Sequence, residues 1–162
     1  RGTDGIPAAQ ADSARLPFRD RSIGALTLVN VVDQAGEPLG IVREAYRVLL
    51  PGGFVAIRVP NAGFHRPWVR VLSALGPFVR WREWDAYPIL HHFALAPSGL
   101  RQLVERAGFT ILELRNSPPA VGDARRWWRT PVAAAAAVVA AASGGRWLVG
   151  PSIELYARKE GG

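Results

Sequence analysis

The sequence predicts an α/β fold that begins with a strand, a helix and a second strand. Residues 23–32 and 54–59 are apolar runs rich in β-branched side chains, the composition of strands inside a sheet. Between them, apolar residues recur at the i, i+3, i+4, i+7 spacing of one helix face: Ile41, Val42, Ala45, Val48 and Leu49. Because a strand, a helix and a strand in this order form a βαβ unit, the pattern indicates a parallel sheet.

The helix near residues 38–50 is expected to reach the second strand through a turn at residues 51–53, Pro-Gly-Gly. Proline removes a backbone donor, and glycine reaches the positive φ that reverses a chain. A right-handed crossover then places the two strands side by side, with their carboxyl ends on one edge of the sheet. Ligands of open α/β sheets bind at that edge, so residues 30–34 and 60–64 lie where chemistry is expected.

The sequence predicts a further helix near the C-terminus. Alanine favours helix strongly, so the run of alanine and valine at 132–142 predicts a helix, which Gly144-Gly145 ends.

The alanine-rich run follows a cluster of arginine and tryptophan at residues 125–129. The run is about half the ~20 residues that a membrane-spanning helix needs. We expect a helix packed against the rest of the protein. The alternative is an interfacial helix with a Trp-Arg anchor, which would give residues 125–142 a peripheral contact with a membrane.

Composition indicates one globular domain of 162 residues, with 49% hydrophobic and 20% charged residues. The absence of cysteine excludes disulfides and thiolate chemistry and fits a cytoplasmic protein. The net charge of +7 comes almost wholly from arginine, since Lys159 is the only lysine. This charge could favour anionic partners, but a solvated basic surface is the simpler interpretation.

Four motifs in order resemble the class I S-adenosylmethionine-dependent methyltransferases of the small-molecule type. The first two are Asp12-Ser13 with Leu16-Pro17-Phe18, and Glu44-Ala-Tyr-Arg-Val-Leu-Leu-Pro-Gly-Gly53. The third is similar to the family's helix at residues 101–109, which ends in Ala-Gly-Phe, and its next strand at 110–114. The fourth is similar to the family's closing strand, at residues 152–159. The resemblance implies a Rossmann-like sheet with helices on both faces. The family's first strand and glycine-rich cofactor loop have no counterpart here, so we expect the C-terminal part of such a domain, with its sheet incomplete at the N-terminus.

The resemblance also implies cofactor contacts for S-adenosylmethionine. Asp12 would accept a hydrogen bond from the adenine amine, because a carboxylate is acceptor-only, and Ser13 would offer its backbone amide. Asp4 would bind the ribose hydroxyls, and Asn30 would line the pocket. The alternatives are that Asp12 caps a turn and that Asn30 simply ends a strand.

We expect a single partial methyltransferase domain over residues 1–162, with two insertions. The resemblance implies that residues 62–97 form a lid-like segment that varies with substrate, and the composition of residues 117–150 indicates an alanine-rich helical insertion. His91 and His92, in the lid, are weak candidates for a general base, although a structural histidine is more common. No metal-ligand spacing occurs, so no metal is expected.

The leading hypothesis is therefore methyl transfer to a small-molecule or lipid-like acceptor. The alternative is a non-catalytic binding or scaffold module, which the missing glycine-rich loop, Gly24 and Gln34 favour because all three depart from the family pattern. Nucleic acid is not an expected partner, and an NAD-dependent oxidoreductase is disfavoured because no G-x-G-x-x-G occurs. The oligomeric state stays open.

Overall fold

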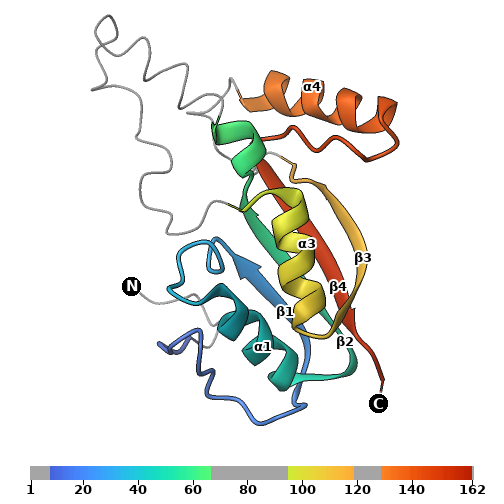
Figure 1. Cartoon of the computed structure of the whole chain (residues 1–162). Coiled ribbons are helices and arrows are strands. Elements are labelled where there is room, and N and C mark those ends of the chain that lie inside the picture. Colours follow the sequence, from blue (N-terminus) through green and yellow to red (C-terminus); the bar gives the residue numbers. More distant parts are fainter. Residues whose placement is uncertain (1–7, 67–94, 119–128, 162) are drawn as a thin grey trace, which may run out of the picture.

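A computed structural model describes residues 8–66, 95–118 and 129–161 of the chain (Figure 1). The mixed α/β class predicted from the sequence is confirmed. The elements are β1 (Ile23–Val29), α1 (Pro38–Val48), β2 (Leu49–Pro60), α3 (Pro97–Arg106), β3 (Phe109–Asn116), α4 (Arg129–Ala142) and β4 (Ser152–Lys159). The predicted lid falls mostly outside the described residues, although residues 62–66 are helical.

The four strands form one sheet in the order β1-β2-β4-β3. β1 and β2 are parallel, with Thr27 opposite Ala56, as the βαβ pattern predicts. β4 lies between β2 and β3 and is antiparallel to both, with Ala157 opposite Val55 and Ile111. The carboxyl ends of β1 and β2 therefore meet at the edge where β4 begins and β3 ends.

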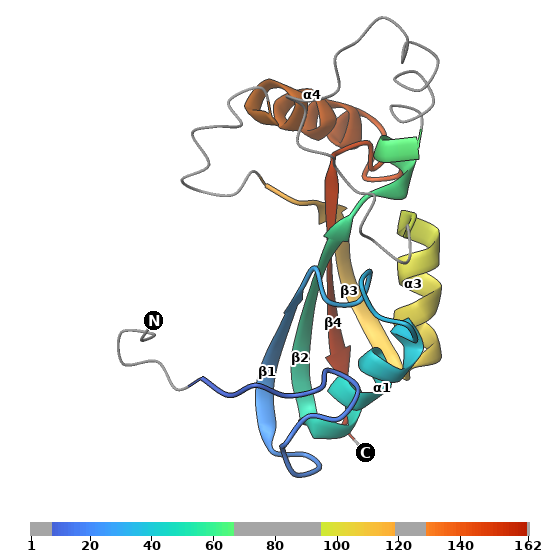
Figure 2. The ribbon, with the colours of Figure 1, turned by 90° about the vertical axis from the view of Figure 1, so that its left-hand side faces the viewer.

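Helices α1 and α3 pack against the same face of this sheet (Figure 2). The core between them is built from alternating strand residues and one stripe of each helix: Val55, Ile57, Val59, Ile153, Leu155, Ala157, Val42, Leu100 and Val104. On the opposite face, Val29 and Phe54 are about half exposed, at 50% and 49%. In the part of the chain that the structure describes, the expected helices on the second face are not seen.

The Pro-Gly-Gly segment is a bulge inside β2, where the sequence predicted a turn ahead of the strand. β2 starts at Leu49, which pairs with Ile23, and the next pair is Phe54 with Ala25, so residues 50–53 loop out of the ladder. Gly52 has φ +78°, and a Cβ on Gly53 would lie 2.9 Å from the Leu50 carbonyl oxygen. Glycine is needed for this bulge for reasons of both backbone conformation and space.

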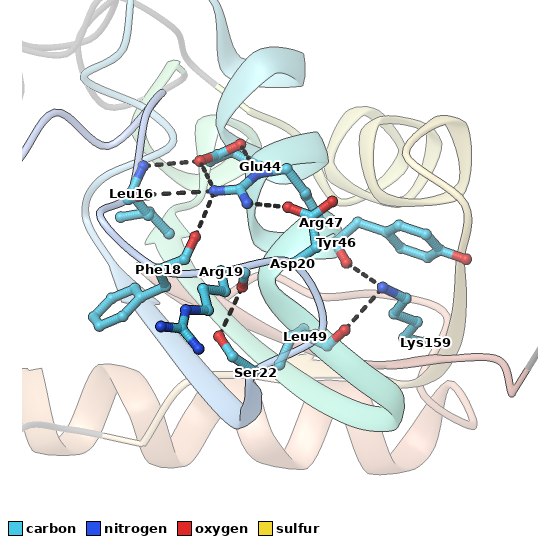
Figure 3. A network of polar contacts seen from close by, with 10 residues as sticks. All are labelled: Leu16, Phe18, Arg19, Asp20, Ser22, Glu44, Tyr46, Arg47, Leu49 and Lys159. Atoms are coloured by element: carbon cyan, nitrogen blue, oxygen red, sulfur yellow. Dashed lines mark hydrogen bonds and ion pairs between the residues drawn. The ribbon is translucent and has the colours of Figure 1, made fainter.

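The carboxyl end of α1 is capped by the only lysine in the sequence (Figure 3). Lys159 Nζ, reaching across from β4, donates to the carbonyl oxygens of Tyr46 at 2.6 Å and Leu49 at 2.8 Å. It also lies 4.5 Å from the centre of the Tyr46 ring. Burial lowers the pKa of this ammonium, while the helix terminus and the ring favour its charge.

The end of α4 agrees with the sequence prediction. Gly144 and Gly145 have φ +60° and +78°, and the Gly145 amide donates to the Ala140 carbonyl oxygen at 2.7 Å. Left-handed glycines that return a hydrogen bond to the last turn are the usual way to end a helix. The chain then runs through residues 146–151 into β4.

Candidate functional site

The candidate site is the sheet edge at the carboxyl ends of β1 and β2. β1 ends at Val29 because Asn30 adopts the left-handed conformation, with φ +53°. Its amide still pairs with β2, donating to the Arg58 carbonyl oxygen at 2.9 Å. Asparagine tolerates this conformation better than most residues, and such backbone geometry occurs often at functional edges. The predicted strand of residues 23–32 is therefore shorter, and Asn30 is exposed at its end.

The turn after Asn30 carries a carboxylate that the sequence analysis did not single out. The Gln34 amide donates to the Val31 carbonyl oxygen at 3.2 Å, which closes the turn. Within it Val32 is fully buried and Asp33 is 1% exposed. Burial of an aspartate carboxylate is costly. The signal for it in the sequence was an acid placed directly behind an apolar run.

The segment after β2 is fixed by a buried asparagine. Asn61 Nδ2 donates to the carbonyl oxygens of Leu148 at 2.7 Å and Gly150 at 2.9 Å, and its Oδ1 accepts from the Gly63 amide at 2.9 Å. His65 Nε2 lies close by and donates to the Pro151 carbonyl oxygen at 2.8 Å. Asn61 thus binds the loop before β4 to the carboxyl end of β2.

A second asparagine, at the end of β3, binds both this loop and helix α4. Asn116 Oδ1 accepts from the Gly150 amide at 2.9 Å, and its Nδ2 donates to the Ala136 carbonyl oxygen at 3.0 Å. Together the two asparagines hold α4 and residues 146–151 against the strand ends. Sequence reasoning missed both side chains. Their position at the carboxyl ends of strands was the available signal.

The loop ahead of β1 is bonded to α1 by a pair of charged side chains (Figure 3). Glu44 Oε1 accepts from the Leu16 amide at 2.8 Å, and Arg47 Nη2 donates to the Phe18 carbonyl oxygen at 3.0 Å. Arg47 also pairs with Glu44 at 2.7 Å and with Asp20. We call Glu44 and Arg47 the α1 clamp.

The electrostatics of the α1 clamp agree with its geometry. The hydrogen bond from Arg47 lowers the pKa of the Glu44 carboxyl, and the Glu44 and Asp20 carboxylates raise the pKa of the Arg47 guanidinium. Both groups are therefore charged at neutral pH. The family motif Glu-x-x-Arg-Val-Leu has a structural meaning here, since its two charged residues hold the Leu-Pro-Phe segment.

The predicted adenine ligands lie at the start of this loop. Asp12 Oδ1 accepts from the Ala14 amide at 2.9 Å, and the Asp12 carbonyl oxygen accepts from the Arg15 amide at 2.9 Å. The structure thus shows the turn-capping role of Asp12, with half-buried Ser13 in the same turn. A carboxylate has a second acceptor oxygen, so the turn does not use its full capacity.

The remaining predicted site residues are not brought together by the described structure. Asn30 lies at the end of β1, ahead of the turn of residues 31–34, and Asp12 and Ser13 lie in the turn of residues 12–15. Asp4, His91 and His92 lie outside the described residues. Their assignments stay predictions.

Comparisons with known proteins agree with the motifs. A family model described as "Methyltransferase domain" matches residues 2–57. The demethylmenaquinone methyltransferase of Protochlamydia amoebophila is 33% identical over 110 residues, which is 61% of this chain and 45% of that protein. The ubiquinone/menaquinone biosynthesis C-methyltransferase UbiE of Bartonella tribocorum is 29% identical over 143 residues, 76% of this chain and 52% of that protein. The chain therefore spans about half the length of these relatives.

A solved structure supports the fold. A SAM-dependent methyltransferase from Thermotoga maritima superposes with a TM-score of 0.58 at 15% identity, covering 96% of this chain and 65% of that one. At this identity the likeness concerns the fold alone. The family model and the two relatives agree with the motifs and support a class I S-adenosylmethionine-dependent methyltransferase.

Proposed function

We propose that this protein transfers the methyl group of S-adenosylmethionine to a small, lipid-like acceptor of the quinone type. Two relatives carry quinone methyltransferase names, which supports the acceptor class. When bound, the cofactor supplies a methyl group on a sulfonium, and the protein mainly has to align the acceptor atom with it. A catalytic triad is therefore not required.

The observation that carries the proposal is the α1 clamp. It bonds the segment that follows Asp12 and Ser13 to the helix between β1 and β2. A loop held at both the Leu16 amide and the Phe18 carbonyl can offer a preorganised contact to a ligand. In this proposal, Asp12 accepts from the adenine amine, and the Ser13 amide donates to the adenine ring.

Other parts of the site follow from the edge of the sheet. Asn30 would line the cofactor pocket, and Asp4 would bind the ribose hydroxyls. His91 and His92 stay weak candidates for a base. We further propose one domain for residues 1–162, with the lid at 62–97 covering the acceptor and with the second insertion at 117–150.

A non-catalytic module is the second candidate, and two departures from the family pattern favour it, Gly24 and Gln34. The contacts described above would hold the adenine side of a cofactor and leave its methionine side to other residues. We expect the 162-residue chain alone to bind S-adenosylhomocysteine weakly. Micromolar affinity would overturn this expectation.

The test of the proposed function is methyl transfer by the native polypeptide that carries these residues. It is incubated with methyl-labelled S-adenosylmethionine and a prenylated naphthoquinol that lacks the ring methyl group. Label in the extracted quinone supports the proposal. If cofactor binds but neither this acceptor nor a benzoquinol is labelled, the quinone class is wrong. If the polypeptide does not bind the cofactor at all, it is better described as a non-catalytic binding or scaffold module.

A further inference from the structure

Helix α4 is apolar on every side and yet exposed. Among its described side chains, residues 134–142, all are alanine or valine, and Val138 is 67% exposed. Beside it, Trp147 and Val149 are 68% and 43% exposed. We call Val138, Trp147 and Val149 the α4 surface. A helix that is apolar all round is normally buried in a protein or in lipid, so this exposure calls for a partner.

The charges around α4 indicate what kind of partner that is. The sequence from Ala124 to Ile153 contains no aspartate or glutamate. Its charged residues are all arginine: Arg125, Arg126, Arg129 and Arg146. Trp147 follows Arg146, and both are exposed in the structure. Tryptophan beside arginine at the end of an apolar helix suits the headgroup level of an anionic bilayer, where the ring stays amphipathic and the cation meets phosphate.

We propose that the α4 surface docks onto an anionic lipid bilayer, with α4 lying in the plane of the interface. The helix has 14 residues and rises about 21 Å, which is shorter than the hydrocarbon core of a bilayer. None of the described helices is long and apolar enough to cross a membrane. Shallow insertion buries Val138, Trp147 and Val149 and keeps Arg146 among the headgroups.

The structure couples this surface to the candidate site. Asn116 Nδ2 donates to the Ala136 carbonyl oxygen on the inner side of α4, and Asn61 binds the Leu148 and Gly150 carbonyls beside Trp147. Figure 1 shows α4 lying across the end of the sheet where these contacts form. Docking would bring the carboxyl edge of β1 and β2 close to the bilayer. That a lipid-like acceptor benefits from this placement rests on the proposed function.

The test is flotation of the native polypeptide with vesicles of phosphatidylcholine alone or with phosphatidylglycerol, without cofactor. Trp147→Glu and Val138→Glu are compared with Leu112→Glu, since Leu112 is 55% exposed on β3 and is not part of the α4 surface. We expect binding to the anionic vesicles to fall about tenfold or more for the first two variants. We expect Leu112→Glu to bind like the wild type, and Arg146→Glu to lose roughly fivefold or more.

Several outcomes would overturn the proposal. The first is that the wild type does not bind the vesicles, and the second is that Leu112→Glu lowers vesicle binding as much as the α4 variants do. The third is that the wild type binds no vesicle but forms a dimer that Val138→Glu dissociates. Because the substituted side chains are exposed, circular dichroism should be unchanged, and a variant that loses this signal is replaced by Trp147→Ser. Vesicle binding is measured without S-adenosylmethionine. Failure of docking and failure of methyl transfer are therefore read separately.

Discussion

Arg47 on α1 donates a hydrogen bond to the Phe18 carbonyl oxygen at 3.0 Å, so the helix between the two parallel strands holds the loop that leads into β1. The same guanidinium contacts Glu44 and Asp20. Four distant groups thus depend on two side chains of one helix turn: the Leu16 amide, the Leu16 and Phe18 carbonyls and the Asp20 carboxylate. The loop with the predicted adenine ligands is ordered by the helix, and α1 has a role beyond packing.

Replacing Arg47 by methionine should destabilise the protein and loosen this loop. The substitution keeps the aliphatic stem and removes the donors to the Phe18 and Leu16 carbonyls. We expect a lower midpoint of urea unfolding and faster amide exchange at Leu16. Arg101→Met is the control, because Arg101 is exposed and its one ion pair among the described residues is with Glu105, at i, i+4 and 3.8 Å. Equal effects of the two substitutions would contradict the clamp.

The stability that Glu44 provides should disappear in acid. The hydrogen bond from Arg47 lowers the pKa of this carboxyl below its ordinary 4.5. A folded pKa below the unfolded one means that the contribution is complete above 4.5 and is lost as pH falls through the folded pKa. The difference in thermal midpoint between wild type and Glu44→Gln should be constant at neutral pH and narrow below about pH 4.5. If the difference in thermal midpoint instead widens in acid, the ion pair of Glu44 and Arg47 is not the source of this stability.

Lys159 should make stability rise with pH on the alkaline side. Burial lowers its folded pKa below the ordinary 10.5, so between the two values the unfolded chain binds more protons than the folded one. Stability then increases as pH rises through that window. Lys159→Met should remove this slope, and Arg158→Met, at the exposed neighbouring position, should keep it.

At neutral pH, Lys159→Met should also cost about 1–3 kcal/mol of unfolding free energy, because the Tyr46 and Leu49 carbonyls lose their donor. Urea unfolding followed by circular dichroism measures both effects. Lys159→Met with wild-type stability at pH 7 would mean that the lysine does not cap α1.

Asn61→Leu should be strongly destabilising although it introduces an apolar side chain into the core. The half-buried carbonyl of Leu148 and the buried carbonyl of Gly150 would lose their donor, at a cost of about 2–3 kcal/mol. Hydrogen exchange at Gly63 should also speed up, since its amide donates to the asparagine side chain. The control is Gln34→Ala, an exposed amide in the turn after β1. A neutral Asn61→Leu variant would contradict the role of the asparagine in holding the loop.

Local sequence patterns predicted most of the helices and strands, because these elements depend mainly on residues that are neighbours in the sequence. The helix stripe at Ile41, Val42 and Ala45 and the closing strand at 152–159 agree with the structure. The bulge at residues 50–53 was not predicted, because it is defined by the pairing of Leu49 with Ile23 on another strand. The parallel pairing of β1 and β2 followed from the handedness of crossovers, which needs no contact information.

The candidate site was less predictable for the same reason. Asn61 bonds to carbonyls 87 and 89 positions further along the chain, and no local window contains both partners. The motif at Asp12 and Ser13 indicated a family. It left two roles open for Asp12, adenine contact and turn capping, because aspartate suits both, and the structure shows the turn. Asp33 was overlooked since its burial depends on the packing of the turn after β1.

The most direct test of the central claim is titration of the native polypeptide with S-adenosylhomocysteine, comparing wild type with Asp12→Asn. Asparagine keeps the acceptor for the Ala14 amide and so preserves the turn, but it replaces one acceptor oxygen by an NH₂ that repels the adenine amine. We predict saturable binding by the wild type, about tenfold or more weaker binding by Asp12→Asn, and unchanged binding by Glu37→Gln at an exposed acid. Wild type without affinity, or Asp12→Asn with full affinity, would contradict the account.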